Sequence, residues 1–324
     1  MPLSPEVLDF LRRRTLEDAG RIRGGTIGRH RAVTRSQGRD FLEYRSYAPG
    51  DDFRDIDWRT SGRVDRVVVR QTEGEQRLGL MLALDAGGAM NYGEGATKRW
   101  QYARQVIESL GWLAQRQSDA LGILAGCDGE VRAIAMPISN RFTDPVQLQS
   151  RLSGVQPAGL CPWEELIRSI RRRTRGRGSV LVISDLLDLS TQARDDPKAA
   201  ANATFTALAE LMTTGHHVVV LQLIHPDELE FPWRDVAQVQ FECSRGLRSS
   251  VETDAGALRD GYRASLSEYL RGLEASAARE RIPLVRARTD APLVSTLTDL
   301  LDALAGHVQS SRGEAELAKE AGLS

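Results

Sequence analysis

The feature of this 324-residue chain that most restricts its fold is an alternation of short apolar runs with longer amphipathic segments, from Leu78 onward. The runs at 78–84 and 180–183 carry no alternating polar residues, which is typical of strands buried on both faces of a sheet. The segment 98–117 has apolar residues at helical spacing. This alternation predicts an α/β fold: a doubly wound, mostly parallel sheet in three layers, with helices on both faces.

The remaining elements of this sheet follow from the same periodicities. Because only five residues separate the runs 121–125 and 131–136, we expect these two strands to be antiparallel. Further strands are expected at 218–224 and 284–287, and helices at 163–173, 199–213, 258–279 and 293–305.

The N-terminal part of the chain has a different pattern. Ser4 followed by Pro5 is typical of a helix start, so residues 1–20 are expected to contain a helix that docks on the main body. Short β-branched and aromatic runs at 33–34, 41–47 and 64–71 predict a strand-rich segment over 21–77. The main domain then covers 78–308, and 309–324 is a polar tail.

Composition excludes several classes of protein. The formal net charge is −1, so there is no global electrostatic argument for nucleic acid or anionic lipid as a partner. Cys127, Cys161 and Cys243 are far apart and form no C-x-x-C pair, which argues against disulfides and thiolate zinc and favours a reducing compartment. No signal-peptide core is present, and no apolar run approaches the roughly 20 residues of a membrane-spanning helix. We therefore expect a cytoplasmic protein with no membrane segment of its own.

The usual catalytic signatures are missing from the sequence. The five histidines form no H-E-x-x-H pair, and no G-x-S-x-G elbow is present for a serine nucleophile. Residues 93–98 resemble a phosphate loop but lack the spacing that directs backbone amides at phosphates. The expectation is a protein that is not an enzyme and that carries no cofactor.

Acidic residues follow several of the predicted strands. Asp85 ends the first strand, Asp185 follows the strand 180–183 after Ser184, Asp227 follows the strand 218–224, and Asp290 follows the last strand. Ligands of open α/β sheets bind at the carboxyl ends of the strands, and neighbouring carboxylates suit a hard divalent cation. The alternative is that each aspartate only caps the helix that follows it.

These residues and one upstream motif carry a resemblance to known families. A buried strand ending in Asp85, a long helix, a strand pair and a later strand ending in Ser184-Asp185 resemble a von Willebrand factor A-type domain. The stretch 45–59, RSYAPGDDFRDIDWR, resembles the signature of the bacterial domain-of-unknown-function family 58. This resemblance covers about Gly20 to Leu304.

A-type domains typically bind Mg²⁺ through a D-x-S-x-S motif, a threonine and a later aspartate, and the resemblance places Asp85 and Asp185 at the two aspartate positions. The serine positions hold Gly87 and Ala89, and the threonine position falls near Cys161. Glycine, alanine and a soft thiol do not replace hydroxyl ligands of a hard cation. We therefore expect a degenerate site that binds Mg²⁺ weakly or not at all.

The upstream motif also has a physical interpretation of its own. The dipeptide Pro49-Gly50 is typical of a turn, and the arginines of the motif can form ion pairs with its aspartates. The first interpretation is a structural, salt-bridged connection in which Trp58 anchors the turn in the core. The alternative is a carboxylate cluster that binds a metal for hydrolysis. The structural interpretation rests on Arg45, Asp51, Asp52, Arg54, Asp57 and Trp58, and the hydrolase alternative on Asp51, Asp52, Asp55 and Asp57.

The family resemblance implies a protein-binding adaptor, because A-type domains generally bind proteins and relatives commonly accompany MoxR-type AAA+ ATPases in bacterial gene neighbourhoods. We therefore expect the chain to bind such an ATPase and to act as its accessory factor in the chaperone-like assembly or remodelling of a client protein. The partner is expected at the carboxyl ends of the strands, with contacts from Trp163, Leu187, Asp185 and Asp227. The runner-up is the hydrolase, and a nucleic-acid binder using the arginine run 168–177 ranks last.

Overall fold

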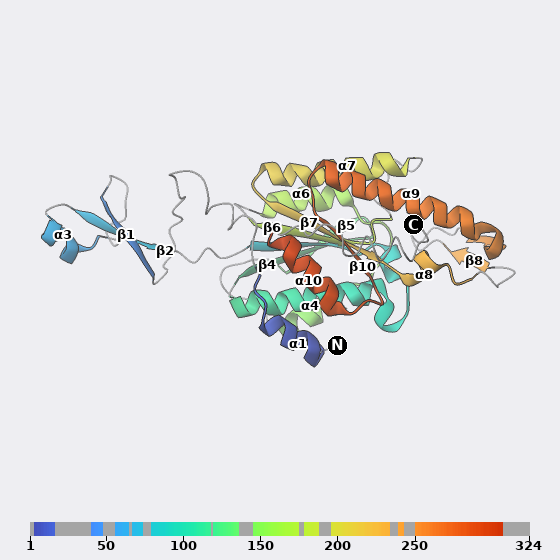
Figure 1. The fold of residues 1–324 in the computed structure, drawn as a ribbon, viewed down its shortest axis with the longest axis horizontal. Coiled ribbons are helices and arrows are strands. Elements are labelled where there is room, and N and C mark those ends of the chain that lie inside the picture. Colours follow the sequence, from blue (N-terminus) through green and yellow to red (C-terminus); the bar gives the residue numbers. More distant parts are fainter. Residues whose placement is uncertain are drawn as a thin grey trace. The chain divides into compact units, whose positions relative to one another are not determined.

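The protein is described here by a computed structural model that covers residues 3–16, 40–47, 56–64, 67–73, 79–117, 119–135, 145–174, 178–187, 196–233, 239–242 and 250–306. The chain forms two compact units. The main unit contains residues 1–23 and 78–324, and the small unit contains residues 24–77. Figure 1 shows the elements of both units.

A six-stranded sheet with the order β10-β7-β6-β3-β4-β5 forms the centre of the main unit. All neighbouring strands are parallel except β5, which pairs antiparallel with β4. The predicted fold class is therefore confirmed: an α/β protein with a mostly parallel, doubly wound sheet. The strands are β3 (Gly79–Asp85), β4 (Ala120–Cys127), β5 (Glu130–Ala135), β6 (Ser179–Ser184), β7 (His217–Ile224) and β10 (Leu284–Arg288).

Helices cover both faces of this sheet, as Figure 1 shows. One face carries α4 (Arg99–Gln117), α10 (Leu293–Leu304), α5 (Pro145–Ser153) and the N-terminal α1 (Pro5–Arg12). The other face carries α6 (Trp163–Arg173), α7 (Pro197–Thr213) and α9 (Ala255–Arg279). The main unit thus has the three layers that the apolar runs predict.

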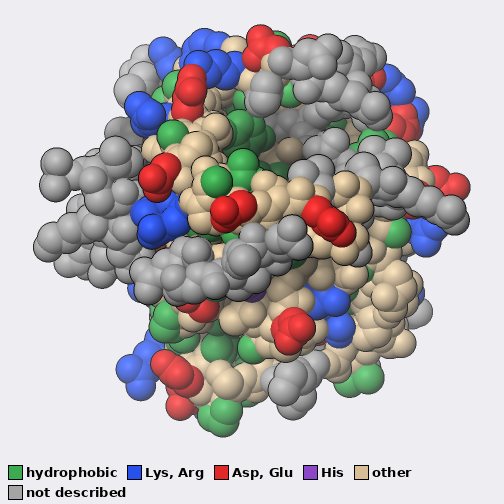
Figure 2. All heavy atoms as spheres, turned by 90° about the vertical axis from the view of Figure 1, so that its right-hand side faces the viewer, with side chains coloured by type: hydrophobic (Ala, Val, Ile, Leu, Met, Phe, Trp, Pro, Cys, Tyr) green, Lys and Arg blue, Asp and Glu red, His purple; other side chains and the backbone are tan. Residues whose placement is uncertain are grey.

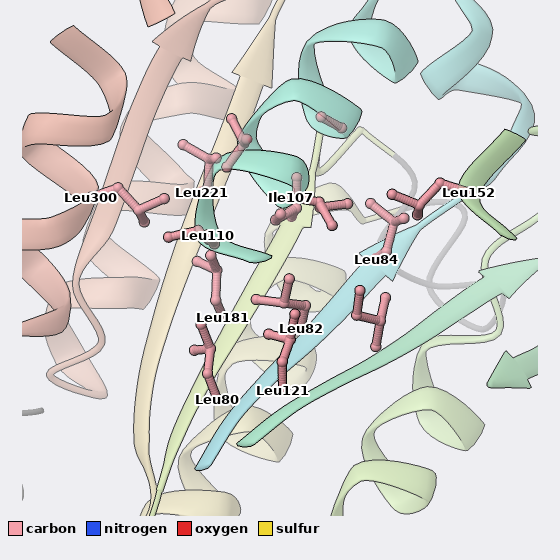
Figure 3. Close-up of a cluster of buried hydrophobic side chains, with 14 of the residues drawn as sticks. Leu80, Leu82, Leu84, Ile107, Leu110, Leu121, Leu152, Leu181, Leu221 and Leu300 are labelled. Atoms are coloured by element: carbon pink, nitrogen blue, oxygen red, sulfur yellow. The ribbon is translucent and has the colours of Figure 1, made fainter. Parts of the chain in front are cut away.

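The hydrophobic core consists of two clusters, one on each face of the sheet, because alternate side chains of a strand point to opposite faces. Leu80, Leu82 and Leu84 of β3 point to the cluster under α4 and α10, which is drawn in Figure 3. Met81 and Ala83 of the same strand belong to the cluster under α6, α7 and α9. Since successive side chains of a strand point to opposite faces, a strand buried on both faces must be apolar throughout.

The N-terminal helix α1 begins as the sequence predicts. The Ser4 side chain caps it by accepting a hydrogen bond from the Val7 amide at 3.3 Å, and Val7 and Leu11 are buried in the cluster under α4. At the far end of α4, the Gln117 side chain accepts from the Leu16 amide (2.6 Å) and donates to the Leu16 carbonyl (3.2 Å). These contacts hold the N-terminal segment on the main unit.

The small unit contains a two-stranded antiparallel sheet, β1 (Asp40–Ser46) with β2 (Val68–Glu73), and the helix α3 (Trp58–Val64). Val64 was expected to begin a strand, but it ends α3 and the strand begins at Val68. The strand expected at 33–34 lies outside the described residues, as does the tail 309–324.

Several short elements were not expected from the sequence. They are the helices α5 and α8 (Pro226–Glu230), the hairpin of β8 (Val239–Glu242) and β9 (Ser250–Thr253), and the 3-10 turns η2 (Gly88–Asn91) and η3 (Gly95–Thr97). Within the described parts of the chain, none of the helices has the length and apolar character needed to cross a membrane.

Candidate functional site at the carboxyl edge of the sheet

Four loops meet at the edge where β3, β6 and β7 end, which is here called the carboxyl edge. They are residues 86–98 after β3, 154–162 before α6, 185–187 after β6 and 225–230 after β7. Backbone hydrogen bonds join the first two loops, because the Gly88 amide donates to the Gly159 carbonyl (2.9 Å) and the Ala158 amide donates to the Ala86 carbonyl (3.0 Å). These two bonds connect the loop that follows Asp85 to the loop that precedes α6.

Asp85 is buried at the end of β3 and accepts hydrogen bonds on both carboxylate oxygens. Oδ1 accepts from the Gly87 amide at 2.8 Å, and Oδ2 accepts from the Ser184 hydroxyl at 2.6 Å. The Ser184 oxygen in turn accepts from the Leu186 amide at 2.9 Å. Buried carboxylates need such partners, and here they connect the ends of the neighbouring strands β3 and β6.

Asp185, 1% exposed, is bound differently, because one of its partners carries a charge. Its Oδ1 accepts from the Leu187 amide at 3.0 Å, and its Oδ2 lies 3.3 Å from Nη1 of Arg99. Leu186, which lies between Asp185 and Leu187 in sequence, has a left-handed backbone with φ = 58°, which is unusual for a leucine. Left-handed residues of this kind cluster at functional sites, and this one turns the chain directly after Asp185.

Arg99 is the first residue of α4, and its side chain is only 3% exposed. Nη1 also donates to the Ala89 carbonyl at 2.8 Å, and Nη2 forms an ion pair with Glu228 of α8. Burial alone would lower the pKa of the Arg99 guanidinium, but the charges of Asp185 and Glu228 outweigh it and hold that pKa above its ordinary value. Arg99 therefore remains a cation inside the carboxyl edge.

The short helix α8 is joined to this cluster through its first residues. His225 caps it, since the His225 ring accepts from the Asp227 amide (3.2 Å) and the His225 amide donates to Glu228 (2.9 Å). The Tyr92 hydroxyl donates to Asp227 at 3.0 Å. Burial and this hydrogen bond both raise the pKa of Tyr92, so the hydroxyl stays protonated.

Gly93 gives the loop after β3 the space it needs beside α8. Its φ is +94°, and a Cβ atom at this position would lie 2.8 Å from the His225 ring. A larger residue would therefore clash with His225 and also strain the backbone. Tyr92 packs edge-on against the same ring, with ring centroids 4.9 Å apart.

The donor set does not fit the magnesium ion that the A-type resemblance implies. Asp85 and Asp185 each accept protein donors on both oxygens, and Arg99 places a positive charge beside Asp185. A Cβ atom at Gly87 would lie 3.1 Å from Asp85 Oδ1, so this position has no room for an extra ligand side chain without movement. The thiol of Cys161 is buried. Over the described residues, no group of three or more histidine, cysteine, aspartate or glutamate residues could hold a metal ion.

The structure places the expected partner-binding residues at this edge, with unequal access to solvent. Trp163, 6% exposed, packs with Leu166 and Ile167 in the core cluster under α6, so the expectation of an exposed tryptophan anchor is wrong. Asp185 is likewise inaccessible. Leu187 is half-buried and the Asp227 side chain is about one third exposed, so these two residues remain available to a partner.

An aromatic cluster beside α8 was missed by the sequence analysis. Phe231 is buried, and its ring lies 5.3 Å from Trp233, 5.2 Å from Tyr262 and 6.3 Å from Phe241, measured between centroids. The cluster packs α8 and β8 against the first turns of α9. The cluster joins residues that are distant in sequence, from Phe231 to Tyr262, so no local spacing pattern predicts it.

Exposed carboxylates surround this part of the main unit. They belong to Glu94, Asp227, Glu230 and Asp290, and Arg288 forms ion pairs with the last two at 2.7 and 2.8 Å. Figure 2 shows the face of the main unit that carries α8 and β8, where acidic and basic side chains are interspersed with hydrophobic ones. The described carboxylates and Leu187 give the edge both acidic and apolar groups.

The upstream motif is described only in part. Asp51, Asp52, Arg54 and Asp55 lie outside the described residues, as does the side chain of Arg45. Asp57 caps α3, because its Oδ1 accepts from the Thr60 amide at 2.9 Å. The expectation that Trp58 anchors the core is wrong, since Trp58 is the first residue of α3 and is 67% exposed.

The arginine run 168–177 begins in the last turns of α6, which ends at Arg173, and the described arginines of the run are exposed. Glu165 forms ion pairs with Arg168 and Arg172, and Arg171 pairs with Glu210 of α7 at 3.3 Å. Residues 175–177 lie outside the described part of the chain. Cations at the C-terminus of a helix also complement its dipole, so these contacts account for the run without a nucleic acid.

Comparison with protein families gives one match over most of the chain. The family described as "Protein of unknown function DUF58" matches residues 43–269, more than two thirds of the sequence. Among curated proteins, the uncharacterized proteins Rv1480 of Mycobacterium tuberculosis and Mb1516 of Mycobacterium bovis are each 24% identical over 317 residues. The alignments cover 94% of this chain and 93% of those proteins.

Solved structures with a related arrangement are more distant in sequence. The hypothetical protein BatB of Bacteroides thetaiotaomicron is 16% identical, with a TM-score of 0.43, and the match covers 72% of this chain and 100% of that one. The SpRpn10 VWA domain is 11% identical, with a TM-score of 0.40, and the match covers 72% of this chain and 99% of that one.

Proposed function

Since the chain belongs to the DUF58 family of proteins of unknown function, we propose that it is a non-enzymatic adaptor that binds a protein partner at the carboxyl edge of its sheet. The observation that carries this proposal is the state of the carboxylates there. Asp85, Asp185 and Glu228 are each engaged by protein donors or by Arg99, so they hold together the loops after β3, β6 and β7. A rigid, loop-built surface of this kind is suited to recognition.

The chemistry of the surface favours a partner with basic and apolar groups. Glu94 is exposed and Asp227 is about one third exposed, and Leu187, in the loop after β6, contributes a half-buried apolar side chain to the same edge. Exposed charges mainly raise the rate of association and make it sensitive to salt, while apolar burial supplies affinity. The partner proposed from the family resemblance is a MoxR-type AAA+ ATPase, with the chain acting as its accessory factor in remodelling a client.

The test is a pull-down of the ATPase from the same genome with the full chain and with two variants, Leu187→Asp and Asp227→Asn. Glu210→Lys is the control. Glu210 is exposed near the end of α7, where the chain enters β7, so it belongs to the edge at which the strands begin and not to the carboxyl edge. We expect both edge variants to lose binding at least tenfold, with melting temperatures close to that of the parent. The control should bind like the parent.

Two results would contradict the proposal. If both edge variants bound the ATPase like the parent, the partner surface would lie elsewhere. If the purified chain hydrolysed a generic phosphoester with Mg²⁺ or Mn²⁺, and Asp51→Ala and Asp52→Ala abolished the activity, the chain would be an enzyme.

A further inference from the structure

The carboxyl edge holds a charged side chain at the position where the A-type resemblance places a metal ion. The guanidinium of Arg99 contacts Asp185, the later aspartate of that pattern, and the carbonyl of Ala89, which stands at its second serine position. We propose that Arg99 takes the place of the divalent cation in this chain, so that the site carries a permanent, covalently attached positive charge. The inference does not depend on the proposed adaptor function.

The contacts of Arg99 match those that a bound cation would make. Three oxygen acceptors from three different loops surround it: the Ala89 carbonyl at 2.8 Å, the Asp185 carboxylate at 3.3 Å and the Glu228 carboxylate. Hard cations collect oxygen ligands from separate loops in the same way. Through Arg99, the loops after β3, β6 and β7 are held together.

The position of Arg99 in its helix supports a specific role. It is the first residue of α4, where the helix dipole is positive and disfavours a cation, and the first turn of α4 contains no acidic residue. Burying a guanidinium is also unfavourable without paired carboxylates. Helix formation therefore does not explain Arg99, whereas its contacts with Asp185 and Glu228 do.

A second cation at the same place would be repelled. A divalent ion bound to Asp185 would lie within a few ångströms of the guanidinium in a buried setting, where charges interact strongly. It would also have to displace the donors that both aspartates already accept. Arg99 and a metal ion are thus alternatives for one site.

The first experiment uses the unmodified full-length chain. Its melting temperature is measured in a chelator and in millimolar Mg²⁺ or Mn²⁺. A ligand that saturates the native state raises the melting temperature by several degrees, so we expect a difference below about 1 °C. A rise of about 5 °C or more that disappears in Asp185→Asn would overturn the proposal.

The second experiment asks whether Arg99 acts as a counter-ion or only fills space. Arg99→Met is compared in the parent and in a Glu228→Gln background, where one carboxylate has already been neutralised. We expect the melting temperature to fall markedly less in the second background. Arg104→Met on the same helix is the control, since Arg104 pairs with Glu108, and it should cost the same in both backgrounds.

An equal loss from Arg99→Met in both backgrounds would show that Arg99 is not coupled to the Glu228 charge and would overturn the proposal that it acts as a counter-ion for both carboxylates. If Arg99→Met does not fold, Arg99→Lys replaces it in the same cycle, because it keeps the charge but loses the fork that joins Asp185 to Ala89 and Glu228. The chelator experiment requires no variant at Arg99 and decides the question of the metal by itself.

Discussion

The carboxyl edge of the main unit and the turn at Asp57 in the small unit use the same local chemistry in different surroundings. In both, an aspartate accepts a backbone amide two or three residues further on: Asp85 from Gly87 and Asp57 from Thr60. Asp85 is buried and bound to Ser184 of a neighbouring strand, whereas Asp57 is followed directly by the exposed Trp58. Because an unsatisfied polar group costs more when it is buried, we expect burial, more than the type of contact, to decide what such an aspartate contributes to stability.

The strongest test of this comparison is Asp185→Ala. It leaves the buried Arg99 without one of its carboxylates, and breaking a buried ion pair on one side typically costs about 3–5 kcal/mol. We expect a loss of this size in the free energy of unfolding, measured by urea denaturation. Asp9→Ala is the control, because its pair with Arg12 is exposed and should contribute about 0–1 kcal/mol. Similar losses in both variants would show that burial is not the deciding factor.

A smaller effect is expected from Ser184→Ala. This variant removes the hydroxyl that donates to Asp85 and leaves a buried carboxylate oxygen with one donor fewer, at a cost of about 1–3 kcal/mol. Ser153→Ala, at an exposed serine of α5, should change stability by less than about 0.5 kcal/mol. Denaturant midpoints of the two variants measure the contrast, and an unchanged midpoint for Ser184→Ala would mean that another donor replaces the hydroxyl.

In the small unit, Asp57→Ala should cost about 0.5–2 kcal/mol as the loss of a helix cap. Trp58→Ala should change stability by no more than about 0.5 kcal/mol, since most of its ring is exposed. Hydrogen exchange of the α3 amides reports on this unit directly. A loss of about 3–5 kcal/mol for Trp58→Ala, the value for a buried aromatic residue, would refute the interpretation of Trp58 as a surface residue.

The smallest effect belongs to the rim of the carboxyl edge. Hydrogen bonds from Arg288 lower the pKa of Asp290 below its ordinary value near 3.8, and burial opposes this only in part. Because the pKa is lowered in the folded state, the stabilising contribution is present above the ordinary pKa and is lost as the pH falls through the lowered value. We expect Asp290→Asn to cost less than about 1 kcal/mol at neutral pH and nothing in strong acid. A constant difference at all pH values would exclude the ion pair as its source.

The sheet and its helices could be predicted because burial on two faces leaves a direct pattern in the sequence. The expected helix 163–173 agrees with α6 at both ends, and the antiparallel β5 follows from a connection too short for a crossover. Those patterns depend on neighbouring residues alone, so a single sequence contains them.

The site was less accessible to prediction, since its contacts join distant parts of the chain. Arg99 lies 86 positions from Asp185, and at the start of an amphipathic helix it has the appearance of an ordinary surface residue. The available signal was a cation in the first turn of a long helix, against the dipole. Trp58 was misjudged for the opposite reason: an aromatic residue within a long motif suggests a core, but α3 turns its first residue toward solvent.

The hydrogen bonds between Gln117 and Leu16 bear on whether the small unit can be removed from the chain. Leu16 is the last described residue before the small unit, and Gly79, the first described residue after it, lies beside Ala120 in the sheet. Leu16 and Gly79 are therefore both held near the junction of α4 and β4, beside Gln117 and Ala120. Because a short loop costs little entropy to close, we expect that a linker of a few residues between Leu16 and Gly79 could replace the small unit. Other domains could then be inserted between Leu16 and Gly79 without changes to the strands of the main unit.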